Sequence, residues 1–164
     1  MISEIKEFSP FEPSVKERFE SLVRAHWEEV QREDPADEFD LHWDFLLNMT
    51  KLKMVGFIGA FVDDFLVGYY ALMFVPSLHT KKGAERAKMA QDLGWFVHKE
   101  YRKGRVGVKL LKAAEAVAYR QGCYGNAVSI KVIKNARPEG LLSLLGYACT
   151  EHRYTKGLGE KKHA

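Results

Sequence analysis

The feature that most constrains the fold is an apolar run that ends in a basic turn with glycines and continues directly into a helical pattern. It reads DLGWFVHKEYRKGRVGVKLL, from Asp92 to Leu111. Glycines let the backbone bend tightly and approach a ligand without interference from Cβ. The start of the following helix offers unpaired N–H groups and the positive end of the helix dipole. The segment therefore predicts a strand, a tight turn and a helix that could hold a phosphate.

The glycine pattern of this turn leaves two interpretations open. Arg102, Lys103, Arg105 and Lys109 place positive charge around it, as a phosphate site requires. However, no Gly-Lys-Ser/Thr follows, so the turn is not a P-loop, and the three-glycine dinucleotide fingerprint is missing. A basic turn before a helix is also typical of a simple solvated connection.

Length and composition indicate one globular domain over residues 1–164, with residues 157–164 as a frayed tail. The 164 residues are 46% hydrophobic, enough for a proper core. The net charge of +3 does not point to nucleic acid. No apolar run reaches membrane-spanning length, and the polar N-terminus does not resemble a signal peptide. Cys123 and Cys149 have no metal-ligand spacing, so we expect reduced thiols in a cytoplasmic protein and no metal.

The chain before the turn contains helical and strand patterns. A capping box at Ser14 and Glu17, followed by apolar residues at helical spacing, predicts a helix that ends before Glu33. The other elements predicted before the turn are a first strand at 2–8, a second helix at 40–49, and strands at 53–62, 65–75 and 89–97. Alternation along the last strand predicts that Asp92, Gly94 and Phe96 share one face.

The chain after the turn predicts a helix that faces a sheet. Its apolar, alanine-rich face runs from Val106 to Gln121, and Gly122 is the expected C-cap. The remaining predicted elements are a strand at 127–133, a short helix at 138–145 that ends at Gly146, and a closing strand at 147–156.

This order of elements and two motifs resemble the GNAT superfamily of acyl-CoA-dependent N-acetyltransferases. The segment FVHKEYRKGRVGVKLLKAAEAVAYRQGC resembles the family's acetyl-CoA motif, whose Arg/Gln-x-x-Gly-x-Gly/Ala pattern falls on Arg102, Arg105 and Gly107. Arg105 thus replaces the first glycine. The stretch from Asn135 to Tyr147 resembles a second family motif, with Leu142 where a tyrosine general acid often stands. The segments VRAHWEEV, VPSLH and TEHRYTKGL resemble members encoded by phages.

The resemblance implies a fold and a cosubstrate. The fold is α+β, with a central, mostly antiparallel twisted sheet flanked by helices in a single domain. The cosubstrate is acetyl-CoA, with pantetheine on the main chain of the strand and the diphosphate on the turn. The coenzyme-binding residues implied in this way are Trp95, Phe96, Val97, Arg102, Lys103, Gly104, Arg105, Val106, Gly107, Val108 and Asn135.

The same resemblance implies direct attack of an amine on the thioester. The amine must lose its proton, and the departing thiolate must be protonated or stabilised. Asp92 is the candidate proton acceptor, since a carboxylate in a partly dry cleft becomes a better base. Tyr147 and Ser143 are candidate acids, and His79 is a candidate substrate contact. Each of these also has a plain alternative as a solvated or core side chain.

The leading hypothesis is an N-acetyltransferase that acts on a primary amine of a small molecule or a protein. The alternative is a catalytically silent GNAT-fold module that binds CoA or another protein. A nucleic-acid-binding protein is third, and a homodimer is left open. Acidic residues in the first helices would favour a cationic amine, or they form a solvated face.

Overall fold

The computed structural model describes residues 4–31, 38–78, 87–130 and 139–150. The chain divides into two compact units, Met1–Lys131 and Val132–Ala164, each described by itself. The first unit contains β1 (Glu4–Glu7), α1 (Pro13–His26), the π-helix η1 (Trp27–Gln31), α2 (Trp43–Lys51), β2 (Val55–Val62), β3 (Phe65–Pro76), β4 (Lys88–Val97), the 3₁₀ turn η2 (Lys99–Tyr101), α3 (Val106–Arg120) and β5 (Cys123–Ala127).

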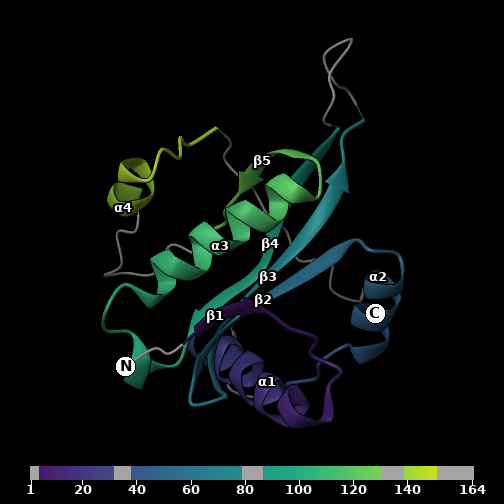
Figure 1. The fold of residues 1–164 in the computed structure, drawn as a ribbon, viewed down its shortest axis with the longest axis vertical. Helices are drawn as coiled ribbons and strands as arrows, with labels where there is room; N and C mark the ends of the chain where they lie inside the picture. The colour runs from purple at the N-terminus through teal and green to yellow at the C-terminus, as the bar shows by residue number, and fades with distance from the viewer. Residues whose placement is uncertain (1–3, 32–37, 79–86, 131–138, 151–164) are drawn as a thin grey trace, which may run out of the picture. The chain divides into compact units, whose positions relative to one another are not determined.

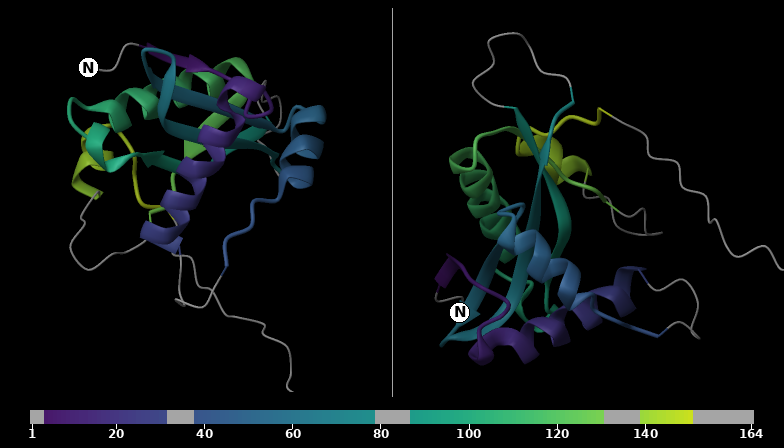
Figure 2. Two further views of the ribbon diagram at one scale, coloured as in Figure 1. Left: turned by 90° about the horizontal axis from the view of Figure 1, so that it is seen from below. Right: turned by 90° about the vertical axis from the view of Figure 1, so that its right-hand side faces the viewer.

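The five strands form one mixed sheet in the order β1-β2-β3-β4-β5 (Figure 1). The first four strands pair antiparallel in sequence, and β5 alone runs parallel to its neighbour, β4. Helix α3 lies on one side of this sheet, and α1 and α2 lie on the other (Figures 1 and 2). The predicted α+β class with a mostly antiparallel, helix-flanked sheet is therefore confirmed.

The central hairpin of β2 and β3 is buried on both faces because helices cover both. Its turn lies between the strands predicted at 53–62 and 65–75 and consists of Asp63 and Asp64, which both have positive φ, 48° and 65°. Two such residues in a two-residue turn match the right-handed twist of the flanking strands. Aspartate tolerates this conformation better than most residues.

One face of the sheet packs on α1 and α2 through an aromatic core. Phe19 of α1 makes edge-to-face contacts with Phe57 and Tyr69, with ring centroids 5.7 and 5.3 Å apart. Leu22 of α1 is completely buried in the same cluster, which also contains Phe96 of β4. Burial of several large side chains, each contributing about 1.5–3 kcal/mol, fixes α1 on this face.

The opposite face packs on α3 at close range. Leu110 and Ala114 of α3 are fully buried. A Cβ at Gly56 of β2 would lie 3.1 Å from the Phe74 ring and 3.7 Å from Val117, so a side chain there would press into this layer. Small residues in the helix and the strand thus let α3 lie close to the sheet, as its alanine-rich pattern predicts.

A β-bulge interrupts β4 beside its centre. Leu72 of β3 is paired with Asp92, and Ala71 is paired with Gly94, so Leu93 is the extra residue. Ala71 and Leu93 lie against the α1-side core, whereas Asp92, opposite Leu72, belongs to the α3 face. The prediction that Asp92 shares a face with Gly94 is wrong because the bulge breaks the two-residue alternation.

Two other boundaries also differ from the sequence prediction. Helix α1 begins at Pro13 with Glu12 as N-cap and has no side-chain cap, so the capping box predicted at Ser14 does not form. Proline is well suited to the first helical position, which needs no N–H donor. Strand β5 spans Cys123–Ala127, earlier than the predicted 127–133, and residues 128–130 are not a strand.

The second unit contains the short helix α4 (Glu139–Leu144), close to the predicted 138–145. Gly146 ends it with a φ of 88°, and the Tyr147 N–H donates to the Leu142 carbonyl. Residues 147–150 are not in a strand, and the rest of the predicted closing strand lies outside the described residues. Within the described ranges, no helix is both long and apolar enough to cross a membrane.

Candidate active site

The site begins at an open edge of β4. Pairing between β4 and β5 runs from Lys88↔Cys123 to Gln91↔Ala127 and stops there. On that side of β4, no strand of the described chain pairs with residues 92–97. In any strand, main-chain donors and acceptors project to both sides. The second half of β4 therefore offers main-chain groups to an extended ligand.

The turn after β4 brings the chain directly into α3. Gly104 and Arg105 both have positive φ, 77° and 64°, and Arg105 is the N-cap of α3. Arginine at a left-handed position costs about 1–3 kcal/mol, so the geometry explains why a glycine would be favoured there. The predicted glycine turn is present, with the arginine held in the conformation of a glycine.

The amide groups at the start of α3 have no acceptor in the part of the chain that the structure describes. The first intrahelical bond runs from the Lys109 N–H to the Arg105 carbonyl, at 3.0 Å. Among the described residues, no hydrogen bond uses the N–H groups of residues 104–108. Those of residues 105–108 are four unpaired donors at the helix start, and with the helix dipole behind them they suit an anion.

Trp95 lies beneath this helix start. A Cβ on Gly107 would lie 3.2 Å from Cζ2 of the Trp95 indole, so α3 begins in contact with β4 only because residue 107 is a glycine. The indole is also 5.8 Å from the Tyr70 ring on the same face. The open edge of β4 and the start of α3 are thus adjacent, and they meet at Gly107.

Arg102 holds the turn instead of projecting freely. Its Nε donates to the Val97 carbonyl at 2.9 Å, and its Nη2 donates to Oε2 of Glu29 at 2.6 Å. The Arg102 hydrogen bond lowers the pKa of Glu29. Its guanidinium also lies 5.3 Å from the centroid of the Phe96 ring. The side chain therefore ties the end of β4 to η1, and a contribution to coenzyme binding remains a prediction.

Asp92 stands where β4 and β5 separate. Its Oδ1 accepts a hydrogen bond of 2.8 Å from the Ser129 N–H, just beyond the end of β5. The carboxylate thus bridges the two diverging strands immediately past their last pair. Its predicted role as a proton acceptor is not tested by this contact.

His26 and Tyr69 form a buried polar pair that the sequence analysis did not single out. His26 Nδ1 lies 2.7 Å from the Tyr69 hydroxyl, and its ring stacks on Phe96 at 5.2 Å. Burial lowers the pKa of His26 and raises that of Tyr69. A histidine on the buried stripe of a helix was the signal in the sequence, but its partner comes from a strand 43 residues away.

The positions of four other predicted site residues relative to the edge of β4 stay predictions. Asn135 and His79 lie outside the described residues. Ser143 and Tyr147 lie in the second unit, where the Ser143 carbonyl accepts from the Gly146 N–H as α4 ends. Their roles as acids stay predictions.

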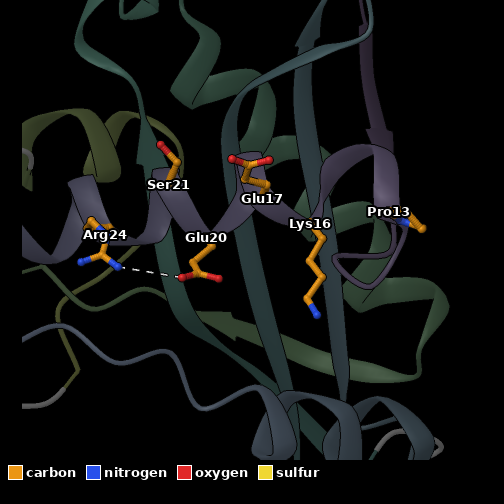
Figure 3. A pocket seen from close by; sticks show the side chains of 6 residues that line it. All are labelled: Pro13, Lys16, Glu17, Glu20, Ser21 and Arg24. Atoms are coloured by element: carbon orange, nitrogen blue, oxygen red, sulfur yellow. Dashed lines mark ion pairs between the residues drawn. The ribbon is translucent and has the colours of Figure 1, made fainter.

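A separate hollow of about 430 Å³ lies along the outer face of α1 (Figure 3). It is lined by Pro13, Lys16, Glu17, Glu20, Ser21 and Arg24. Its lining includes positively and negatively charged side chains, and Arg24 forms an ion pair with Glu20 at 3.9 Å. No residue of β4 or of the turn lines it, so it is distinct from the β4 edge.

In the described part of the chain, an open strand edge, a left-handed turn and a helix start with unpaired amides therefore lie next to one another, an arrangement that suits an extended ligand with an anionic group. The family model described as "Acetyltransferase (GNAT) family" matches residues 17–147. The chain belongs to this family. No curated protein sequence matches the chain.

Several solved structures share the fold at low sequence identity. An aminoglycoside acetyltransferase, HMB0005, from an uncultured soil metagenomic sample has a TM-score of 0.74 at 15% identity, over 95% of this chain and 98% of its own. The aminoglycoside acetyltransferase AAC(6')-Iy, bound to a CoA bisubstrate analogue, has a TM-score of 0.69 at 17% identity, over 94% and 96%. A ribosomal-protein-alanine N-acetyltransferase from Brucella melitensis biovar Abortus 2308 has a TM-score of 0.67 at 15% identity, over 94% and 98%.

Proposed function

We propose that this protein transfers an acetyl group from acetyl-CoA to a primary amine. The observation that carries the proposal is the set of unpaired amides at the start of α3, next to the open edge of β4. Such amides suit a diphosphate, and an unpaired strand edge suits the amide groups of pantetheine. The resident chemistry of the coenzyme is an activated thioester that an amine can attack.

The residues assigned to the coenzyme are those predicted from the sequence. The main chain of residues 95–97 would pair with pantetheine, and the N–H groups of residues 105–108 would bind the diphosphate. Lys103, exposed beside the turn, would add positive charge. This placement supports the proposal because the strand edge and the helix start are contiguous through Trp95 and Gly107.

The reaction must remove two protons from the amine nitrogen. A cationic amine first loses one proton to become a nucleophile, and the nitrogen loses a second after it bonds to the acetyl carbon. The C–S bond then breaks, and the thiolate takes up one proton. Asp92 remains the proposed acceptor for one of the amine protons, directly or through water.

The acceptor amine is proposed only as a class. The structural relatives include enzymes named for aminoglycosides and for an alanine of a ribosomal protein. Both classes of substrate present a primary amine that is cationic at neutral pH. We therefore propose a cationic primary amine.

The test is acetyl transfer measured as release of free thiol. Native protein is incubated with acetyl-CoA and a panel of aminoglycosides, polyamines and peptides with free N-termini, and the products are identified by mass spectrometry. A single acetyl group on the amine of at least one class, with equimolar thiol, is expected. Tight binding of acetyl-CoA without modification of any amine would contradict the proposal.

A silent CoA-binding module is the second candidate. The observation that favours it is Leu142, buried where the family often has a tyrosine acid. The two candidates differ in one outcome, because the silent module binds acetyl-CoA in calorimetry but releases no thiol with any amine.

A further inference from the structure

The imidazole of His26 is a buried titratable group, and one of its two nitrogens has a hydrogen-bond partner. The residue is 8% exposed, at the last position of α1. Nδ1 is hydrogen-bonded to the Tyr69 hydroxyl. For Nε2, no partner lies within the described part of the chain, and Nε2 is not among its fully buried, unsatisfied atoms. One nitrogen is therefore held in place, while the other has no partner among the described residues.

The ring lies against β4 at the bulge. A Cβ on Gly94 would be 3.1 Å from the Tyr69 hydroxyl and 3.5 Å from Cε1 of His26. Cε1 lies between Nδ1 and Nε2, so the contact places this edge of the ring against β4 at Gly94, in the part of the strand beyond its pairing with β5. Stacking on Phe96, with an interplanar angle of 17°, fixes the plane of the ring. The absence of a side chain at residue 94 lets the pair approach the main chain of the strand.

The position of His26 relative to the sheet suits an approaching amine. The start of α3, with the proposed diphosphate site, contacts the face that carries Trp95. His26, Tyr69 and Phe96 are on the opposite face. An amine that attacks a thioester held at the edge of β4 from this face would therefore approach on the side of His26.

The helix changes its geometry directly after His26. The chain continues as the π-helix η1, from Trp27 to Gln31. π-Helical turns are rare and frequently occur at functional sites. This turn carries Glu29, whose ion pair with Arg102 spans from η1 to the turn before α3. The segment around His26 is thereby tied to the end of β4.

We propose that His26 is a further catalytic residue, which accepts a proton from the attacking amine at Nε2. The proposal rests on the proposed acetyltransferase function. In the neutral tautomer that can do this, Nδ1–H donates to the Tyr69 oxygen. The N–H bond of the amine breaks, its proton moves to Nε2, and its electron pair remains on the nitrogen that is bonding to the acetyl carbon. The Tyr69 oxygen still accepts from Nδ1–H in the resulting imidazolium, so Tyr69 is a positioning residue.

The surroundings keep His26 neutral near pH 7. Among the described residues, the charged or titratable groups that face it are Glu29, Arg102 and Tyr69. Burial lowers the pKa of His26, Glu29 acts to raise it, and Arg102 lowers it further. A base has to be unprotonated before it can act, so this balance fits a proton acceptor.

The experiment compares His26→Asn with His42→Asn. Asparagine at residue 26 retains a polar atom near the position of Nδ1 for Tyr69 but has nothing at Nε2. His42 is exposed at the start of α2, so it provides the matched control. With an amine that the native protein acetylates, we expect His26→Asn to lower kcat by about 10²-fold or more. Its acetyl-CoA affinity in calorimetry should stay within about twofold, because ground-state binding of the coenzyme is not removed.

A pH titration of the native protein supplies a test that does not depend on a variant. The acid limb of the kcat/KM profile should coincide with the pKa of His26 measured by NMR. In Tyr69→Phe this limb should move to lower pH, because the imidazolium loses its acceptor. If the pKa of the acid limb differed from the pKa of His26 measured by NMR, the inference would be overturned.

The outcomes separate this inference from the proposed function. Native turnover that persists in His26→Asn would overturn the role of His26 and leave the transferase intact. Absence of turnover by the native protein on every amine would overturn both. A His26→Asn protein that binds acetyl-CoA, unfolds at the native temperature and has lost turnover would support both.

Discussion

The indole of Trp95 lies so close to Gly107 that a Cβ at residue 107 would stand 3.2 Å from Cζ2. This contact joins the open edge of β4 to the unpaired amides of α3, and the proposed coenzyme site depends on it. A side chain at residue 107 has to displace the indole and also projects beside the proposed diphosphate position.

Gly107→Glu is therefore expected to lower acetyl-CoA affinity by at least about 100-fold, through bulk and through charge repulsion at the helix start. Gly107→Ala tests bulk alone and should weaken binding less. Lys112→Gln makes the same change in net charge at an exposed position farther along α3. Calorimetry with acetyl-CoA provides the measurement. Native affinity in Gly107→Glu would show that the coenzyme does not bind at this helix start.

Gly94→Ala examines the packing of the His26–Tyr69 pair. Contacts of 3.1 Å to the Tyr69 hydroxyl and 3.2 Å to its ring leave a methyl group no room without movement. We expect a loss of about 1–3 kcal/mol in the free energy of unfolding, as for other overpacked sites. Gly140→Ala in α4, where no atom lies within 4 Å of the added Cβ, is the control and should change stability by less than about 1 kcal/mol. Urea unfolding measures both, and equal effects would argue against the close approach.

The pH dependence of stability follows from the lowered pKa of His26. In the unfolded chain His26 binds its proton at a higher pH than in the folded protein. The folded state is therefore favoured above the unfolded pKa, and this contribution is lost as the pH falls through the folded pKa. One such group changes the free energy of unfolding by at most about 1.4 kcal/mol per pH unit.

The melting temperature should accordingly fall more steeply between about pH 7 and pH 5 in the native protein than in His26→Asn. Differential scanning calorimetry across this range provides the comparison. If the melting temperatures of the two proteins fell with identical slopes, burial would not lower the pKa of His26, whatever the role of this residue in turnover.

The sequence predicted those parts of the fold that depend on local pattern. The Asp63-Asp64 turn, the apolar strands around it and the helix after the glycine turn all follow from neighbouring residues. The turn at Gly104 and Arg105 was recognised although an arginine replaces a glycine. Local geometry there is set by the need to join β4 to α3 over a few residues.

Features that depend on pairing between distant segments could not be read in this way. The extra residue Leu93 becomes visible only when β4 is paired with β3, so the face of Asp92 was predicted incorrectly. Strand β5 contains Gly125 and Asn126 and has little strand pattern of its own. Its pairing with β4 defines it, whereas the alternating residues after Ala127 suggested a strand too late in the chain. Nothing in the residues around His26 points to Tyr69, which lies 43 residues farther along the chain.

The hydrogen bond from the Ser129 N–H to Oδ1 of Asp92 permits a final prediction about the sequence's candidate base. Asparagine at residue 92 keeps an oxygen acceptor for this N–H and removes the negative charge. Alanine removes both. If Asp92 takes a proton during turnover, Asp92→Asn should lower kcat by about 10²-fold or more while acetyl-CoA affinity stays near the native value. Asp92→Ala should in addition weaken acetyl-CoA binding, because the segment after β5 loses its tie at the point where the strands separate.

Steady-state kinetics and calorimetry on both variants give the answer. Native kcat in Asp92→Asn, with a defect in Asp92→Ala alone, would assign this carboxylate to tying the segment after β5 to β4 and leave the amine's protons to other groups.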